Sequence, residues 1–313
     1  MKSFTTKDEL KTAIEYYFTT NNTSDITNWD TSQITDMSEL FMNIKGISIE
    51  PLTLNWNTSN VIYMQKMFYK CTQDFILNFD TSNVTDMSNM FNEATYINQP
   101  LHFNTKNVTD MSGMFKNAIR FNQPLNFDTS NVIDMSGMFK NAIRFNQPLL
   151  FDTSNVIDMS DMFFHAIIFN QPLNFNTKNV TNMGSMFCSA FAFNHPLTFN
   201  TQNVTNMSYM FGYATNFNQP LKFLSALRNT SKVTNMSYMF SYATHFNQPL
   251  LFDTSNVTDM SYMFRYATYF NQPLSFNTKN VINMFDMFNG AISYNQPIDF
   301  DTTSLKYGTV FET

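Results

Sequence analysis

Hydrophobic and polar positions follow one pattern that returns every 24 residues over most of the chain. The pattern is clearest in the string N-V-T-D-M-S-x-M-F, and its valine, or the residue in that place, serves as the index of each copy. The index positions are Ile34, Val61, Val84, Val108, Val132, Val156, Val180, Val204, Val233, Val257, Val281 and Leu305. A fixed period of this size predicts a solenoid, in which each coil buries its apolar face against its neighbours. We therefore expect one domain despite a length of 313 residues.

Each copy contains segments with different local preferences, as residues 132–155 illustrate. The β-branched run around the index predicts a short strand. Ser136 occupies an N-cap position, and the apolar residues of 138–142 follow at helical spacing, which predicts one or two helical turns. Pro148 ends this element, and the alternation in 149–151 predicts a second short strand. The following Asp-Thr-Ser-Asn stretch is typical of a turn.

Residues at the same distance from the index form columns when the copies are aligned. Methionine recurs three residues after the index and phenylalanine seven residues after it, from Phe41 to Phe288. Because methionine fills irregular gaps well, these columns predict a core rather than a soft-metal site. An asparagine column is unbroken: Asn98, Asn122, Asn146, Asn170, Asn194, Asn218, Asn247, Asn271 and Asn295. We expect buried, stacked amides that satisfy backbone groups at a bend.

The ends of the chain depart from the repeat. Residues 1–28 predict a helical N-terminal cap, in which Thr6 and Glu9 have capping-box spacing. Its apolar stripe is expected to pack on the first coil near Trp29, and consists of Leu10, Ala13, Ile14 and Tyr17. Residues 29–304 predict the solenoid of about eleven 24-residue repeats. An insertion falls near 223–230, and 305–313 predicts a frayed partial coil.

The units D-T-S-N-V-T-D-M-S-x-M-F resemble those of BspA-like leucine-rich-repeat surface proteins, including their mycoplasma-type branch. Good copies span residues 80–91 and 253–264, and the segment 26–32 leads into the first coil as in that family. The resemblance covers nearly the whole chain. It implies an α/β repeat solenoid, with leucine-rich-repeat-like coils of short parallel strands and short helical turns, that serves in interaction and is often displayed on a surface.

Composition narrows the function classes. The net charge of −6 argues against a general nucleic-acid binder. Two cysteines cannot supply a disulfide framework or a zinc site with three or four thiolates. No apolar run reaches the roughly 18 residues that cross a bilayer, and the first ten residues are too polar for a signal peptide. We expect no membrane insertion and a cytoplasmic location, unless the protein is exported by another route.

Residues able to carry chemistry do not converge in the alignment of the copies. The four histidines (His102, His165, His195 and His245) fall in four different columns. Aspartate recurs two residues after the index, where stacked carboxylates would either hold Ca²⁺ or form a solvated face relieved by asparagine; we favour the second. Seven glycines can hardly supply a phosphate loop. We expect no enzyme activity, no cofactor and no metal site.

Columns that vary between copies are the candidates for binding. Basic residues gather in two adjacent copies, at Lys116, Arg120, Lys140 and Arg144. Tyrosines gather in three others, as the i,i+4 pairs Tyr209 with Tyr213, Tyr238 with Tyr242, and Tyr262 with Tyr266. The alternatives are drift of duplicated repeats and a binding surface, where Tyr and Arg are favoured. The leading hypothesis is a protein-interaction scaffold with a protein partner. The alternative is an adhesin that binds host carbohydrate or protein through an aromatic face.

Overall fold

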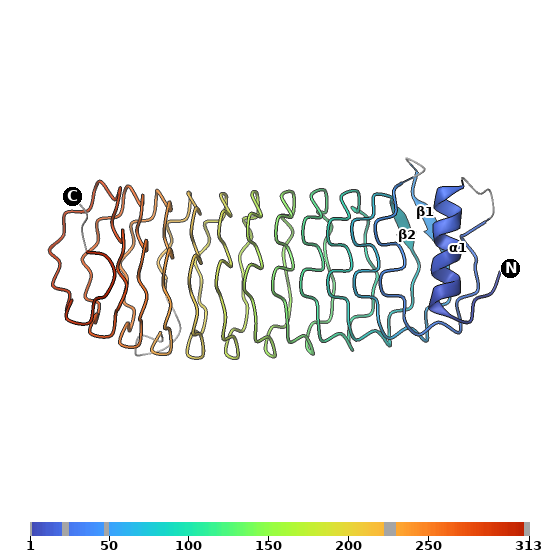
Figure 1. Ribbon diagram of the computed structural model, residues 1–313, viewed down its shortest axis with the longest axis horizontal. Helices are drawn as coiled ribbons and strands as arrows, with labels where there is room; N and C mark the ends of the chain where they lie inside the picture. The colour runs from blue at the N-terminus through green and yellow to red at the C-terminus, as the bar shows by residue number, and fades with distance from the viewer. Residues whose placement is uncertain (1, 21–24, 47–49, 222–229, 310–313) are drawn as a thin grey trace. The chain divides into compact units, whose positions relative to one another are not determined.

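The computed structural model describes residues 2–20, 25–46, 50–221 and 230–309 (Figure 1). It divides into two compact units, unit 1 (Met1–Asp152) and unit 2 (Thr153–Thr313). The described residues contain one helix, α1 (Lys7–Thr19), and two strands, β1 (Leu52–Leu54) and β2 (Phe75–Leu77), which pair in parallel with Leu52 opposite Phe75. All three elements belong to unit 1, where Figure 1 shows them beside one another at its N-terminal side. The rest is a tandem array of repeats with few strands.

Consecutive copies pair in parallel near the index, as the sequence predicts. Isolated parallel bridges join the residues two positions after the index, for example Asp86 to Asp110 and Asp110 to Asp134 in unit 1. The same column continues in unit 2, where Asn206 pairs with Asn235. The pairing is limited to one residue per copy, so the predicted index strands are present only as bridges. The second predicted strand appears as β1 and β2, and as one bridge between Leu197 and Leu221.

The predicted helical turn in each copy is wrong. In the copy indexed by Val132, the N–H of Met138 donates to the carbonyl of Met135, and that of Ala142 to Phe139, which makes successive tight turns. The third residue of each turn has a positive φ, 59° at Gly137 and 57° at Asn141. A left-handed residue at this place interrupts a right-handed helix and is typical of type II turns. Ser136 is not a helix N-cap; its N–H donates to Oδ1 of Asp134 at 2.7 Å.

Within this turn region, from the third to the ninth residue after the index, the backbone hydrogen bonds to another copy all have their donors in the earlier copy and their acceptors in the later one. In the copy indexed by Val84, alternate N–H groups donate to the next copy: Met87 to Asp110, Asn89 to Ser112, Phe91 to Met114 and Glu93 to Lys116, at 2.7–3.0 Å. In an ordinary parallel strand, the N–H groups alternate between the two neighbours. The left-handed residues rotate every second peptide group, so that the N–H groups of one copy all point toward the next copy. Each copy therefore presents a row of backbone donors to the copy that follows it.

The core of each unit consists of the predicted columns. The index valines are fully buried, and so are the methionines three residues after the index and those six residues after it, from Met67 to Met287; most of the phenylalanines are buried as well. In unit 1 the rings of Phe115 and Phe139 stack at 5.7 Å, and Phe121 stacks on Phe115 at 4.1 Å. The same two columns continue in unit 2, with Phe187 on Phe211 at 5.7 Å. The prediction that methionine and phenylalanine fill the core is therefore confirmed.

The N-terminal helix α1 has the predicted capping box, in which Thr6 and Glu9 bond each other's backbone N–H. All four residues of the predicted stripe are buried. The ring of Phe18, at the end of α1, contacts Phe41 at 6.3 Å and Phe75 at 6.5 Å. Trp29 instead stacks on Trp56 at 6.1 Å and contacts Phe4 at 5.0 Å. The helix therefore covers aromatic rings of the first copies of unit 1.

Two predicted features lie wholly or partly outside the described residues. The insertion near 223–230 falls there except for Thr230, which is buried and donates through Oγ1 to the carbonyl of Asp253 at 2.8 Å. Of the predicted partial coil 305–313, the described part pairs as other copies do. Tyr307 forms a parallel bridge with Asn283, and the N–H of Lys306 donates to the carbonyl of Ile282 at 2.9 Å.

Candidate binding surface

The six predicted tyrosines form two stacked columns in unit 2, named here the tyrosine columns. In the first column, Tyr209 stacks on Tyr238 at 4.2 Å and Tyr238 on Tyr262 at 4.3 Å. In the second, Tyr213 stacks on Tyr242 at 4.5 Å and Tyr242 on Tyr266 at 4.7 Å. These spacings approach the ~4.8 Å between paired backbones, so identical side chains in successive copies meet face to face.

All six tyrosines have a left-handed backbone. The φ values of these tyrosines lie between 52° and 60°. This region is uncommon for bulky residues and costs roughly 1–2 kcal/mol per residue. The tyrosines therefore do not lie on a helical turn, and their i,i+4 spacing reflects two consecutive tight turns. Other copies place Ser185, Ser189, Gly137 or Asn141 at the same positions.

In unit 2 the last tyrosine of each column meets a different residue, Gly290 for Tyr266 and Phe285 for Tyr262. A Cβ added to Gly290 would lie 2.4 Å from Cδ1 of Tyr266, so the ring of Tyr266 covers the α-carbon of this glycine. Phe285 meets the ring of Tyr262 edge-on at 5.4 Å. Any side chain at position 290 would displace the last ring, which makes Gly290 part of the site.

Arg265 joins the two columns, which the sequence analysis did not predict. Its guanidinium lies 5.3 Å from the ring centre of Tyr262 and 5.4 Å from that of Tyr266. Its Nε lies 3.8 Å from the carboxylate of Asp286, whose side chain is largely buried. Arg265 lies eight residues after the index, in the same variable column as Lys116 and Lys140. Its place between Tyr262 and Tyr266 in the sequence could have indicated that it belongs to the tyrosine surface.

The outer parts of the tyrosine columns are accessible. Tyr213 and Tyr266 are 40% and 37% exposed, and the other four are half-buried. Burial raises the pKa of Tyr209, Tyr238 and Tyr262, and hydrogen bonds link the hydroxyls of these three residues. The phenols therefore stay protonated at neutral pH. Because each ring face inside a column is covered by the next ring, ring edges and hydroxyls form most of the accessible area.

The repeating polar residues have structural hydrogen bonds. Oδ1 of each described aspartate in the column two residues after the index accepts from the backbone N–H two residues later, for example Asp110 from Ser112 at 2.8 Å. Asparagine can do the same, as Asn206 does for Ser208. In the long asparagine column, Oδ1 of Asn98 accepts from the N–H of Asn122 at 2.9 Å. This ladder is confirmed, although its members are half-buried or exposed rather than buried.

Comparison with protein families finds matches along nearly the whole chain. Residues 12–102, 70–151, 150–228 and 226–311 each match the family described as "Mycoplasma protein of unknown function, DUF285". The chain belongs to this family. Comparison with curated proteins and with solved structures finds none that matches the chain.

In this DUF285-family chain, the four predicted basic residues lie in unit 1. Arg120 and Arg144 are exposed, and Lys116 and Lys140 are half-buried. The guanidinium of Arg120 lies 4.4 Å from the ring centre of Tyr96, which occupies the same column in the preceding copy. The lysines and arginines lie eight and twelve residues after the index, whereas the tyrosines of unit 2 lie five and nine residues after it.

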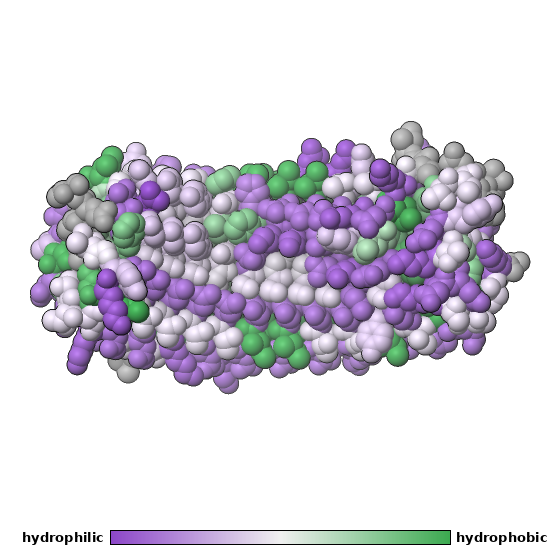
Figure 2. All heavy atoms as spheres, viewed as in Figure 1, coloured by the Kyte–Doolittle hydropathy of each residue, from purple (hydrophilic) through white to green (hydrophobic). Residues whose placement is uncertain are grey.

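Two of the four histidines of this DUF285 chain contact a backbone carbonyl of the preceding copy. Nε2 of His195 lies 3.2 Å from the carbonyl of Asn170, and Nδ1 of His245 lies 2.7 Å from that of Thr215. Both cysteines are buried. Among the residues that the structure describes, no helix combines the length and apolarity that a bilayer-spanning segment needs. On the face shown in Figure 2, hydrophobic residues form small separate groups between hydrophilic bands.

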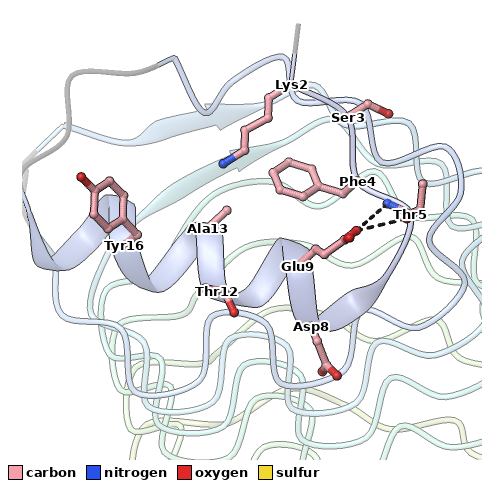
Figure 3. Close-up of a pocket in the computed structure, with 9 residues that line it drawn as sticks. All are labelled: Lys2, Ser3, Phe4, Thr5, Asp8, Glu9, Thr12, Ala13 and Tyr16. Atoms are coloured by element: carbon pink, nitrogen blue, oxygen red, sulfur yellow. Dashed lines mark hydrogen bonds between the residues drawn. The ribbon is translucent and has the colours of Figure 1, made fainter.

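An open pocket of about 810 Å³ lies beside α1 in unit 1 (Figure 3). It is lined by Phe4 and Lys2 on one side and by helix residues that include Asp8, Glu9 and Tyr16 on the other. The ammonium of Lys2 lies 5.0 Å from the ring centre of Phe4. Oε2 of Glu9 accepts from the backbone N–H and the hydroxyl of Thr5, so this carboxylate holds the segment before the helix.

Proposed function

We propose that this chain is a non-enzymatic protein-interaction scaffold that binds a protein partner through the tyrosine columns. The observation that carries the proposal is the left-handed backbone of all six tyrosines. Glycine or asparagine fits these turns with less strain, and copies in unit 1 use them at Gly113, Gly137 and Asn141, whereas other copies place polar or charged residues such as Lys66 and His165 there. Strained backbone occupied by large side chains favours a role in binding over a role in folding.

The geometry of the columns supports a protein partner over a carbohydrate held by ring faces. Sugars stack on open aromatic faces, whereas the faces inside these columns contact one another at 4.2–4.7 Å. Ring edges, hydroxyls and the guanidinium of Arg265 provide mixed apolar and polar contact, as tyrosine and arginine do at protein interfaces. Stacking also holds the rings in place, which lowers the entropy lost on binding.

The finer architecture is part of the same proposal. We infer a leucine-rich-repeat-like solenoid related to BspA-like surface proteins. The parallel bridges and hydrogen-bond rows within each unit favour the solenoid, and the family matches along the chain agree with a mycoplasma-type repeat. Surface display is proposed on the basis of that relation alone.

The test is capture of partners from the native cell with wild-type protein and a variant in which all six column tyrosines become serine. Serine is the residue that Ser185 and Ser189 place in these columns in a preceding copy. The matched control is Leu150→Asn, because Leu150 is 90% exposed and neighbouring copies have Asn126 and Asn174 in its column. We expect a specific protein that the wild type and the control capture and the serine variant does not.

A second outcome would contradict the proposal. If the serine variant keeps its circular dichroism spectrum and captures the same proteins as the wild type, the tyrosine columns are the result of repeat drift.

A further inference from the structure

An open pocket of about 720 Å³ in unit 1 has no role in the function proposed above. It crosses four successive copies and is lined by Ser32, Gln33, Thr35, Asn60, Ile62, Asn83, Thr85 and Asn107. These residues lie within two positions of the index of their copies, so the lining itself follows the repeat. None of them carries a formal charge. We call it the Asn/Thr pocket.

The asparagines of this pocket have a fixed orientation. Nδ2 of Asn60 donates to the carbonyl of Ser32 at 2.8 Å, Nδ2 of Asn83 to that of Ser59, and Nδ2 of Asn107 to that of Ser82, both at 2.7 Å. A backbone carbonyl only accepts, so the nitrogen of each amide must be the atom that faces it. The three Oδ1 atoms therefore point away from these bonds as acceptors, one in each copy.

The threonine hydroxyl follows the same rule. Oγ1 of Thr85 donates its single proton to the carbonyl of Ile62 at 3.4 Å, which leaves its lone pairs as acceptors. The side chain of Ile62 is 38% exposed and adds an apolar strip between the polar columns. The pocket thus combines a row of neutral acceptors and amide N–H donors, repeated about every 4.8 Å, with small apolar surfaces.

We propose that the Asn/Thr pocket binds an uncharged linear oligosaccharide. Sugar hydroxyls both donate and accept, so they can pair with the amide oxygens, with the second N–H of each amide and with the threonine oxygens along the row. The uncharged lining offers no ion pair to an acidic or basic ligand. The C–H faces of the sugar pack on Ile62 and on threonine methyl groups. The bonds between copies hold the side chains in place before binding, so little entropy is lost.

The experiment is calorimetric titration of the full chain with linear hexasaccharides of glucose, of N-acetylglucosamine and of mannose. Hexagalacturonate is the acidic comparison, and a Gly/Ser peptide of similar length is the peptide comparison. Thr85→Lys fills the pocket, and the repeat accepts lysine in this column at Lys306. Thr35→Ile with Thr85→Ile removes two hydroxyls and adds the residue of Ile62. The matched control is Thr198→Leu, an exposed position whose column contains Leu150.

We expect at least one neutral hexasaccharide to bind with a Kd of about 1 mM or lower. Thr85→Lys should abolish this binding, the double isoleucine variant should weaken it about three- to tenfold, and Thr198→Leu should leave it unchanged. The six-serine variant of the tyrosine columns should also bind the sugar normally, which separates this site from the proposed protein-binding surface. The variants are first checked by circular dichroism and melting.

Several results would overturn the proposal. These are no binding of any neutral hexasaccharide at about 1 mM, binding of hexagalacturonate or the peptide alone, or binding that survives both pocket variants. Loss of sugar binding in the serine variant with the pocket variants unaffected would assign the carbohydrate to the tyrosine columns instead.

Discussion

At the residue scale, a column of threonines has a structural role that its local sequence does not indicate. The threonine three residues before the index is buried in each copy from Thr31 to Thr278, and its hydroxyl can donate to a carbonyl of the next copy, as Thr105 does to Asp128 at 2.9 Å. The sequence analysis treated this Asp-Thr-Ser-Asn stretch as a simple turn, because a hydroxyl's partner one copy away cannot be inferred from local spacing.

Replacing Thr105 by valine tests this ladder. The change keeps the shape of the buried side chain but removes the donor to the carbonyl of Asp128, so the free energy of unfolding should fall by about 0.5–1.5 kcal/mol. Urea denaturation followed by circular dichroism measures the loss. Thr105→Ser keeps the hydroxyl and should retain more stability than valine; equal losses would mean that the methyl group, not the hydrogen bond, matters.

Position 185 tests the left-handed turns without disturbing the tyrosines. Ser185 has a φ of 56°, and copies in unit 1 have Gly113 and Gly137 in its column. Valine should lower the free energy of unfolding by roughly 1–2 kcal/mol, and glycine should maintain or raise it. Denaturant titration of both variants checks the order. A valine variant as stable as the wild type would show that this position is not left-handed in solution.

At the element scale, the N-terminal helix was predictable in detail and the repeat turns were not. The capping box and the apolar stripe of α1 are local signals that need no knowledge of the rest of the chain. The segment from Ser136 to Ala142 gives a similar local signal, because an apolar spacing of three and four residues also fits two consecutive tight turns. Bonds to the next copy, and glycine or asparagine at positions 137 and 141, decide in favour of turns.

Removal of α1 tests its role as a cap. Deleting residues 1–20 would expose rings such as Phe41 and Phe75, which Phe18 now contacts. We expect a lower melting temperature or aggregation, measured by calorimetry and light scattering. The control is Tyr16→Ser, since Tyr16 is 59% exposed and should matter little. An unchanged melt after the deletion would refute the capping role.

At the scale of the whole molecule, the period, the core columns and the asparagine ladder could be read from the sequence because every copy repeats them. The low strand content could not be read from the sequence. It arises because left-handed residues turn every second peptide group away from strand geometry, and these residues share no single amino-acid type that would mark them. The two tyrosine columns were identified as a candidate surface, yet their face-to-face stacking and the place of Arg265 depend on how copies align in space.

Alkaline pH should destabilise the fold. Burial raises the pKa of Cys71 to about 12, and it also raises the pKa of Tyr209, Tyr238, Tyr262 and Tyr294 above the ordinary value of 10.0. The unfolded chain therefore releases these protons first, and the free energy of unfolding should fall once the pH passes about 9–10. Denaturation midpoints measured from pH 8 upward should decrease in that range; a constant midpoint would contradict the burial of these groups.

The most direct test of the central claim is the affinity of a captured partner for the wild type and for the variant with serine at all six column positions, measured with the denaturation midpoint of the same samples. The account predicts that affinity falls about 30-fold or more, as hot-spot losses of ~2 kcal/mol imply, while the variant still unfolds in one cooperative transition, because a preceding copy already has Ser185 and Ser189 at these positions. Unchanged affinity would contradict it, and so would a variant that loses binding only because it no longer folds.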